Sequence, residues 1–421
     1  MKKIILTFWV LLTFLNFAQD FTYFSIGDTS DVAITGTGGV CIMGGGTEDD
    51  TAMQWFLNKA QSGNVLVLRA SGSDGYQDYF YNQLGVNLAS VETLVMNNAN
   101  CGSHPFVLDR ISKADAIWFA GGDQFLYKSY LKGTAAEDLI NEHINVENQV
   151  IGGTSAGMAI QGEYYFDAQN GTISSQTALN NPFDQNLTLD NNFLENDYLT
   201  NLITDTHFDS PDRKGRISTF LARLVNDNQE RVFAIACEEY TAICIENNGI
   251  ATVYGGYPEY DDKVYFIQTN CEGYGYPEVI EAGQPLTYTN NQKALHVLEM
   301  QATTTGTATF DLTDWVTSNG GNWQNWYVSN GQLFETSGQA PNCTLSSSKP
   351  SNQTTLNYSV SESHLLFNQI CDEIILYSTD GKVLRRSIQT NQISISGLEK
   401  GLILVHAHKD DTRICSKWFN Y

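Results

Sequence analysis

The chain has 421 residues, enough for one large domain with an appendage or for two ordinary domains, each with a sizeable core. Its formal net charge is −24, because 47 aspartates and glutamates outnumber 23 lysines and arginines. An acidic surface repels a polyanion, so we expect no nucleic acid partner; a dispersed acidic surface is also typical of soluble secreted proteins.

Residues 1–18 have the features of a secretory signal peptide. Lys2 and Lys3 form a basic head, a short apolar run covers residues 4–12, and Ala18 is a small residue at the cleavage position. The run is shorter than the roughly 20 residues that a membrane-spanning helix needs, and no later run approaches that length. Since the leader contains two lysines and no acidic residue, its removal takes the charge from −24 to −26. The sequence therefore predicts a secreted or cell-surface protein with no transmembrane segment in the mature chain.

Eight cysteines in an exported chain permit disulfides but are too sparse to be the scaffold. None of them forms a Cys-x-x-Cys pair or a His/Cys cluster with zinc spacing. We therefore expect no structural metal and no cofactor.

Between residues 20 and 250, apolar runs alternate with helical patterns. Val65–Leu68 and Ala116–Ala120 are continuous apolar runs that predict buried strands, and Gln149–Gly153 predicts a third. Apolar residues at helical spacing over Thr134–Ile144 predict the helix that connects the second strand to the third. This alternation favours an α/β fold with a mostly parallel sheet covered on both faces.

Later segments continue the same pattern. The sequence predicts a strand at Asn201–Asp205, a helix at Ile217–Leu224, strands at Arg231–Ala236 and Thr241–Ile245, and a hairpin turn at Asn247–Gly249. The region from about 262 to 339 is rich in strand and turn patterns, and we interpret it as an extension of one domain covering 19–339.

The composition changes near the C-terminus. Ser, Asn, Pro and Thr dominate residues 340–355, which predicts a linker. Short strand patterns follow at Asp372–Leu384, Ser394–Leu398 and Leu402–Ala407. We therefore expect residues 356–421 to form a small C-terminal β-sandwich.

The strand at Gln149–Gly153 leads directly into Gly153-Thr154-Ser155-Ala156-Gly157. A serine hydroxyl becomes an effective nucleophile when a sharp strand-to-helix turn exposes it beside a base, near backbone N–H groups aimed at the developing oxyanion. The small residues suit such an elbow, and the N–H of Ala156 is a candidate oxyanion donor. A similar turn can also serve as a phosphate cradle or a simple packing turn.

A base for Ser155 has to be found among seven histidines, three of which lie in the tail. His207 follows the predicted strand at Asn201–Asp205, and α/β folds gather functional groups at strand ends. His104 and His143 are more simply explained as surface or loop residues. His296 remains an alternative, because it would give the order of nucleophile, acid and base found in α/β-hydrolases.

Further candidate residues follow predicted strands. Glu239 is placed to orient the histidine, although two solvated charges at Glu238 and Glu239 are the simpler explanation. Gly122 can complete an oxyanion hole while Gln124 faces the substrate; alternatively this segment is a plain turn with an aspartate cap. The acidic glycine loop at Gly44–Asp49 is interpreted as a pocket wall rather than a phosphate site.

These motifs resemble the cyanophycinase and aspartyl-dipeptidase family of serine peptidases over residues from about 40 to 310. The matching motifs are Met43-Gly44-Gly45-Gly46, Phe119-Ala120-Gly121-Gly122-Asp123-Gln124, Gly152-Gly153-Thr154-Ser155-Ala156-Gly157, Asp205-Thr206-His207-Phe208 with Arg213 and Gly215-Arg216, and Glu239-Tyr240-Thr241-Ala242. The resemblance implies a three-layer sandwich like that of flavodoxin or class I amidotransferases. It also implies a Ser-His-Glu triad formed by Ser155, His207 and Glu239.

The resemblance further implies substrate contacts from Gln124, Asp205, Arg213 and Arg216. In such enzymes the substrate is cyanophycin, a poly-aspartate backbone with β-linked arginines, which is cut into β-Asp-Arg dipeptides; guanidinium groups suit the carboxylates. Relatives commonly have an arginine where this chain has Pro211, and some have glutamine at Thr206. These two departures weaken the case for cyanophycin itself and leave the hydrolytic chemistry intact.

The tail resembles the C-terminal sorting module of the type IX secretion system of Bacteroidetes, through Ile375–Lys382 and Ile395–Gly401. That resemblance implies a contact with the secretion machinery, whereas a generic β-sandwich would be a binding module. Taken together, the sequence predicts a secreted serine exopeptidase acting on cyanophycin or related aspartyl peptides, and it is compatible with a homodimer. An α-aspartyl dipeptidase of the same fold and a non-catalytic surface-binding protein remain the alternatives.

Overall fold

The computed structural model describes residues 19–271, 275–342, 358–361, 363–378, 382–398, 401–409 and 412–420. The predicted signal peptide and residues 343–355 of the predicted linker lie outside the described residues. Within the described part of the chain, no helix is both long and apolar enough to cross a membrane.

The first sheet has the strand order β1-β4-β3-β5-β6-β2-β11-β12-β15-β16. Its strands are β1 (Phe21–Gly27), β2 (Val40–Met43), β3 (Asn64–Arg69), β4 (Ser90–Met96), β5 (Ala116–Phe119), β6 (Val150–Thr154), β11 (Ala242–Ile245), β12 (Ile250–Tyr257), β15 (Ala308–Asp311) and β16 (Ser318–Asn319). The centre, β4-β3-β5-β6-β2, is parallel, while the strands on both sides of it pair antiparallel. The prediction of a mostly parallel sheet is therefore correct only for the centre.

Helices cover both faces of this parallel centre, as the apolar runs predicted. Along β5, Trp118 faces one layer, where it packs on Phe56 of α1 (Asp50–Lys59), with ring centroids 5.1 Å apart. The next residue, Phe119, faces the other layer and packs on Tyr127 of α3 (Gln124–Leu131) at 5.3 Å. Successive side chains of a strand point to opposite faces, so a strand buried on both sides is apolar throughout.

The remaining short elements surround this sheet. The π-helix η1 (Tyr79–Gln83) lies in the layer of α1, while α2 (Pro105–Ile111) and α4 (Ala135–Asn145) lie in the layer of α3. A 3₁₀ helix η2 (Ala99–Ser103) precedes α2, and α5 (Ala156–Ala159) follows β6.

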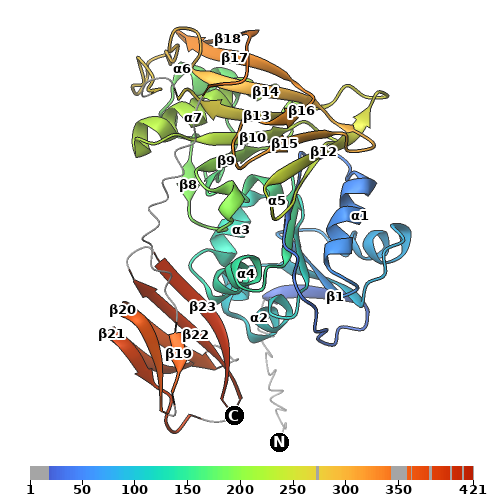
Figure 1. The fold of residues 1–421 in the computed structure, drawn as a ribbon, viewed down its shortest axis with the longest axis vertical. Coiled ribbons are helices and arrows are strands. Elements are labelled where there is room, and N and C mark those ends of the chain that lie inside the picture. Colours follow the sequence, from blue (N-terminus) through green and yellow to red (C-terminus); the bar gives the residue numbers. More distant parts are fainter. Residues whose placement is uncertain are drawn as a thin grey trace, which may run out of the picture.

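A second sheet has the order β18-β17-β14-β13-β10-β9-β7-β8, and in Figure 1 it lies at the top, beside β12, β15 and β16 of the first sheet. Its strands are β7 (Tyr164–Phe166), β8 (Leu189–Asn191), β9 (Leu202–Asp205), β10 (Phe233–Cys237), β13 (Lys263–Thr269), β14 (Leu295–Gln301), β17 (Asn322–Ser329) and β18 (Gln332–Ser337). Only β7-β9 and β9-β10 pair in parallel. The sequence did not predict that β9 and β10 would leave the first sheet and form this second one.

The second sheet is also buried on two sides. In β10, Ile235 belongs to the core shared with the first sheet, whereas Ala234 faces a separate apolar cluster with Phe220 of α7 (Lys214–Asn228). The helix α6 (Ser175–Asn180) contributes to the same cluster, and the 3₁₀ helix η3 (Asp197–Leu199) precedes β9. Strands from the region 262–339 pair in both sheets.

The C-terminal residues form a separate antiparallel sheet with its own apolar cluster (Figure 1). Its strands are β19 (Tyr358–Val360), β20 (His364–Ser378), β21 (Val383–Ser394), β22 (Gly401–Lys409) and β23 (Thr412–Asn420). The long strand β20 shifts register between Leu366 and Cys371, and all five strands are linked into one sheet. The separate β module is thus confirmed, whereas two distinct sheets of a sandwich are not seen in the described residues.

Candidate active site

The serine elbow lies between β6 and α5, where the chain turns sharply. A Cβ atom on Gly157 would lie 2.0 Å from the carbonyl oxygen of Phe119, and one on Gly153 would lie 2.5 Å from the backbone of Gly157. Only glycine permits backbones to approach this closely. Ser155 itself has a φ of 52°, a left-handed conformation that costs free energy in a residue with a side chain and is common at functional sites.

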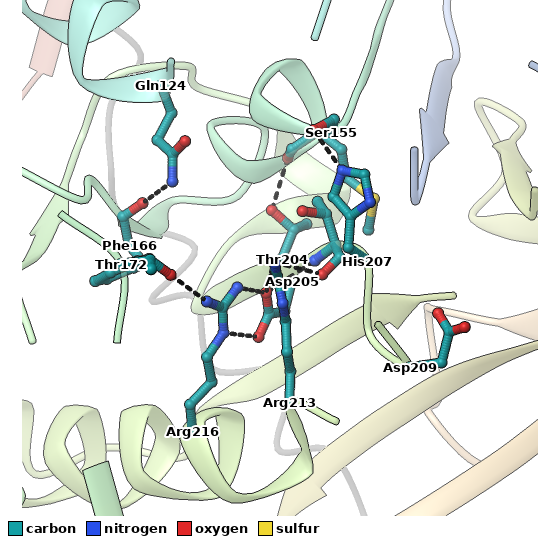
Figure 2. Close-up of polar contacts among 12 residues, drawn as sticks. Gln124, Ser155, Phe166, Thr172, Thr204, Asp205, His207, Asp209, Arg213 and Arg216 are labelled. Carbon is teal, nitrogen blue, oxygen red and sulfur yellow. Dashed lines mark hydrogen bonds and ion pairs between the residues drawn. The ribbon is translucent and has the colours of Figure 1, made fainter. Parts of the chain in front are cut away.

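Ser155, His207 and Glu239 form a continuous hydrogen-bonded series. The Oγ atom of Ser155 lies 2.7 Å from Nε2 of His207 (Figure 2), and Nδ1 of His207 lies 2.6 Å from Oε1 of Glu239. Both distances are those of strong hydrogen bonds. In this arrangement the imidazole can accept a proton from the serine at one nitrogen while the carboxylate holds the other nitrogen in its protonated form.

The two sheets meet at this series. His207 follows β9 and Glu239 follows β10, and the parallel pairing of these strands brings their carboxyl ends side by side. Ser155 comes from β6 of the first sheet, and its N–H donates to the carbonyl of Met43 at 3.0 Å. Ser155 and His207, which are 52 residues apart in the sequence, therefore meet because of the junction of two sheets.

The two neighbouring glutamates have different partners. The N–H of Glu239 donates to Oδ1 of Asp209 at 3.1 Å, which anchors the loop that presents its carboxylate. Glu238 turns away and accepts hydrogen bonds from the hydroxyl of Tyr265 at 2.8 Å and the N–H of Lys263 at 2.7 Å. Burial raises the pKa of Glu238. The simpler explanation of two solvated charges is therefore wrong for Glu238, and the anchoring role of Asp209 was not predicted.

The glycine loop after β2 packs directly on the histidine. A Cβ atom on Gly45 would lie 2.3 Å from Cε1 of His207, so this wall of the site has room for no side chain. The carbonyl of Gly44 accepts from the N–H of His207 at 2.8 Å, and its own N–H donates to Thr241 at 3.1 Å. The loop that the sequence placed in a pocket wall thus joins the end of β9 to the start of β11.

Backbone N–H groups for an oxyanion are available on two segments beside Ser155. A Cβ atom on Gly121 would lie 3.4 Å from Cβ of Ser155, so the Gly121-Gly122 turn after β5 passes close to the nucleophile. Ala156 is the first residue of α5, where a backbone N–H has no partner within the helix. Across the described ranges, neither Gly122 nor Ala156 donates its N–H to another protein atom. Both amides are therefore free to bind an anionic oxygen.

Asp205 and Arg216 form a salt bridge with two hydrogen bonds. Nε of Arg216 donates to Oδ2 of Asp205 at 2.9 Å, and its Nη2 donates to Oδ1 in a second, short hydrogen bond (Figure 2). Both side chains are buried, with 5% of the Arg216 side chain and 4% of the Asp205 side chain exposed. The guanidinium fork that was predicted to bind a substrate carboxylate is therefore already occupied by Asp205.

Arg213 differs from Arg216 because part of its guanidinium is unused. Nη1 donates to the carbonyl of Thr206 at 2.9 Å and lies 3.9 Å from Oδ1 of Asp205. Among the described residues, its buried Nε atom has no partner. Burial lowers the pKa of Arg213, and the nearby charge of Arg216 lowers it further. The side chain of Arg213 is 18% exposed, so a carboxylate at its exposed edge would supply compensating charge.

Gln124 begins α3, and its Nε2 atom donates to the carbonyl of Phe166 at 3.3 Å. Asp123 caps the same helix by accepting from the N–H of Phe125 at 2.9 Å, which was the alternative explanation for this segment. The side-chain oxygen of Gln124 is not part of this bond.

The other histidines lie elsewhere. His104 caps α2 and accepts from the N–H of Phe106 at 3.2 Å. His143 is buried in α4 with its Nε2 atom 2.9 Å from the carbonyl of Val150, so its prediction as a surface or loop residue is wrong. His296 lies within β14, which is separated from β10 by β13, so the alternative base is not beside the serine. The described residues contain no group of three or more potential metal ligands.

The model of peptidase family S51 matches residues 35–253, just over half of the chain. Among solved structures, the chain is similar to a peptidase from an acI-B1 Actinobacterium, with 14% identity over 66% of this chain and 98% of that chain and a TM-score of 0.41. It is also similar to a Listeria monocytogenes EGD-e protein described as "Putative Peptidase E Protein", with 20% identity over 52% of this chain and 98% of that chain and a TM-score of 0.34. A comparison with curated proteins gives no match. Since the matched residues include Ser155, His207 and Glu239, and cover more than half of the sequence, the chain belongs to peptidase family S51 and is a serine-type peptidase.

Proposed function

We propose that the chain is a secreted exopeptidase that hydrolyses aspartyl peptides through an acyl-enzyme on Ser155. The observation that supports this most strongly is the continuous series from Oγ of Ser155 through the imidazole of His207 to the carboxylate of Glu239. It is the arrangement of nucleophile, base and orienting acid that acyl transfer requires.

In the proposed reaction, Oγ of Ser155 attacks the peptide carbonyl while its proton passes to Nε2 of His207. The N–H groups of Gly122 and Ala156 bind the oxyanion that forms. His207 then gives the proton to the departing amine, and water, activated by the same imidazole, releases the acyl group. Glu239 keeps the proton of the neutral imidazole on Nδ1, so that Nε2 faces the serine.

The substrate class follows from the guanidinium that remains available. Arg213 donates to the carbonyl of Thr206, the residue before His207, and keeps 18% of its side chain exposed. A carboxylate binds such a group through charge-assisted hydrogen bonds. We assign Arg213 to the substrate carboxylate, Asp205 and Arg216 to positioning Arg213, and Gln124 to a neighbouring polar contact.

Cyanophycin and α-aspartyl dipeptides are the two substrates to compare. Cyanophycin offers a series of backbone carboxylates, and β-Asp-Arg would be its product. The guanidinium of Arg216 is already paired with Asp205, and Pro211 stands where relatives commonly have an arginine. This chain therefore offers one guanidinium for a substrate carboxylate rather than several. That observation favours the dipeptide, which presents a single aspartyl side chain.

We also propose that the protein is exported from the cytoplasm. The signal-like leader and the resemblance of the tail to a type IX sorting module support secretion or display at the cell surface. The separate apolar cluster of the C-terminal sheet is consistent with a module whose contact is the secretion machinery rather than the peptide substrate. Truncation after residue 339 should leave peptidase activity in place and abolish export from the native host.

Incubation of the protein with cyanophycin and with Asp-Xaa dipeptides, followed by mass spectrometry, tests the substrate. The Ser155→Ala variant should lose at least about 10³-fold in turnover with an almost unchanged melting temperature. A serine-reactive phosphonate should label the native protein and leave Ser155→Ala unlabelled, which would argue against a non-catalytic binding protein. Full turnover by Ser155→Ala would overturn the nucleophile assignment.

A further inference from the structure

Tyr240 combines an unfavourable backbone conformation with an exposed ring. It directly follows Glu239, has a φ of 64°, and leaves 50% of its surface exposed. A bulky residue in this left-handed region is an outlier, since asparagine, aspartate or glycine adopts it more readily. Some compensating interaction is therefore expected.

Burial does not supply that compensation. Trp315 also has a positive φ, of 58°, but it is only 4% exposed and its ring centroid lies 4.4 Å from that of Phe233. Packing of the indole therefore offsets the strain at Trp315. Tyr240 has no aromatic partner among the described residues, and half of its surface faces solvent. Ser155 and His207, which also have a positive φ, both belong to the proposed triad.

The ring of Tyr240 and the imidazole of His207 both lie against the glycine loop after β2. A Cβ atom on Gly45 would meet the imidazole of His207 at 2.3 Å, and a Cβ atom on Gly46 would meet Cε1 of Tyr240 at 2.9 Å. The N–H of Tyr240 also donates to the carbonyl of Gly45 at 2.9 Å. Two consecutive glycines of one loop thus lie against the two rings, so both rings flank the same loop.

The chemistry of acyl transfer determines which part of a peptide reaches this wall. His207 must come within hydrogen-bonding distance of the departing nitrogen in order to protonate it. The residue that contains this nitrogen therefore leaves the site along the histidine side, opposite the oxyanion donors. An exposed aromatic ring there offers an apolar face to the side chain of that residue.

We propose that Tyr240 is a specificity-determining residue that binds the side chain of the departing residue and favours a large apolar one. This inference rests on the proposed function of Ser155 and His207. It adds a second point of recognition, which is distinct from the carboxylate site at Arg213. The strain at Tyr240 is then retained because the ring contacts substrate.

The matched variants are Tyr240→Asn, which removes the ring and suits the left-handed backbone, and Tyr240→Phe, which retains the ring. Asp-Leu and Asp-Gly are suitable substrates, because they differ only in the side chain that would contact the ring. For the native enzyme, kcat/KM for Asp-Leu should exceed that for Asp-Gly by about tenfold. This ratio should fall to near one in Tyr240→Asn, mainly through KM, and remain in Tyr240→Phe.

The melting temperature separates a substrate contact from a structural role. Relief of backbone strain should raise the melting temperature of Tyr240→Asn by about 2 °C while Asp-Gly is still hydrolysed at the native rate. A Tyr240→Asn variant that keeps the native Asp-Leu to Asp-Gly ratio would overturn the inference. Equal loss of both activities, together with a lower melting temperature, would also overturn it, because the ring would then support the fold.

A covalent probe keeps the two proposals distinguishable if neither dipeptide is hydrolysed. That result would refute the aspartyl-peptide proposal alone. A diphenyl phosphonate loses phenoxide when Oγ of Ser155 attacks phosphorus, so an aromatic group then occupies the position of the departing residue. Labelling should be about tenfold slower in Tyr240→Asn than in the native protein and Tyr240→Phe. A fluorophosphonate, which loses only fluoride, should label all three equally; equal labelling by both probes would overturn the inference.

Discussion

Gly45 lies against the imidazole of His207 so closely that a Cβ atom on Gly45 would be 2.3 Å from Cε1 and 2.5 Å from Nε2. Real Cβ atoms do not approach other atoms this closely, so a side chain at position 45 would displace the ring. Nε2 is the atom that forms the hydrogen bond with Oγ of Ser155. A loop that contributes no reactive group therefore sets the position of the base.

Gly45→Ala should lower kcat by about 10²-fold, because a displacement of the base by one ångström is enough to disrupt proton transfer. Gly85→Ala is the matched control, since Gly85 also has a positive φ, of 70°, but has no atom within 4 Å of the added methyl group. Gly85→Ala shows the effect of a side chain at a positive φ without the clash, and only Gly45→Ala should lose activity. Steady-state kinetics together with thermal melts check this, and equal kcat values would contradict it.

The two adjacent glutamates provide a test of the orienting acid. Glu239→Gln should lower kcat by about 10³-fold or more, because a neutral amide no longer holds the proton on Nδ1 of His207. Glu238→Gln should retain kcat, since Glu238 binds Tyr265 and Lys263 rather than the histidine. Loss of activity in Glu238→Gln with native activity in Glu239→Gln would reverse the assignment.

Substitutions of the two arginines should have different effects, one on stability and the other on substrate binding. Arg216→Ala leaves the buried carboxylate of Asp205 without its bidentate partner, so the free energy of unfolding should fall by about 3 kcal/mol or more. Arg213→Ala should change stability much less and raise KM for Asp-Leu by about tenfold, since it removes a charge-assisted contact to the substrate carboxylate.

Chemical denaturation measures the loss of stability, and kinetics with Asp-Leu and its analogue Asn-Leu measure the loss of substrate binding. Asn-Leu lacks the side-chain carboxylate, so its KM should be the same in the native enzyme and in Arg213→Ala. A KM for Asp-Leu that does not respond to Arg213→Ala would remove Arg213 from the substrate site.

Asp115 should make stability depend on pH. Its carboxyl group is buried and accepts the N–H of Asn64 at 2.7 Å, and burial raises its pKa from 3.8 to about 6. A raised pKa means that folding favours the protonated form. The contribution of Asp115 to the free energy of unfolding is therefore complete below pH 3.8 and is lost as the pH rises through about 6.

Asp115→Asn keeps an oxygen acceptor and cannot ionise. Its melting temperature relative to the native protein should therefore rise between pH 4 and pH 7, in parallel with ionisation of Asp115. Asp28→Asn is a control that should not show this rise: hydrogen bonds from Ser30 lower the pKa of the exposed Asp28 carboxylate, so its contribution to stability is lost only as the pH falls below 3.8. A constant difference for Asp115→Asn across this range would contradict the prediction.

Much of the central fold could be predicted because its signals are local. The strands β3, β5 and β6 are continuous apolar runs, and α4 shows apolar residues at helical spacing, so each was predicted within a residue or two of its bounds. The partner of each strand could not be predicted in this way, because pairing depends on contacts between segments far apart in the sequence. For that reason the division into two sheets, with β9 and β10 in the second, was not predicted.

His143 illustrates the same difference at the level of one residue. Its helix was predicted correctly, but its burial against Val150 depends on how that helix packs on the sheet. Periodicity alone did not distinguish a buried histidine from an exposed one. The occupied fork of Arg216 is a second example, because Asp205 reaches it only when α7 packs on β9.

By itself the sequence determined the elbow at Ser155, since the sharp turn arises from glycines and small residues within a few positions of the serine. The motif order also located His207 and Glu239 as its partners. Only the tertiary structure decided that their hydrogen bonds join two sheets, that Gly45 positions the imidazole, and that Arg213 rather than Arg216 has a guanidinium that is only partly paired. The physical reason is that side-chain contacts of this kind depend on the packing of distant strands and helices, whereas a strained turn depends mainly on its own few residues.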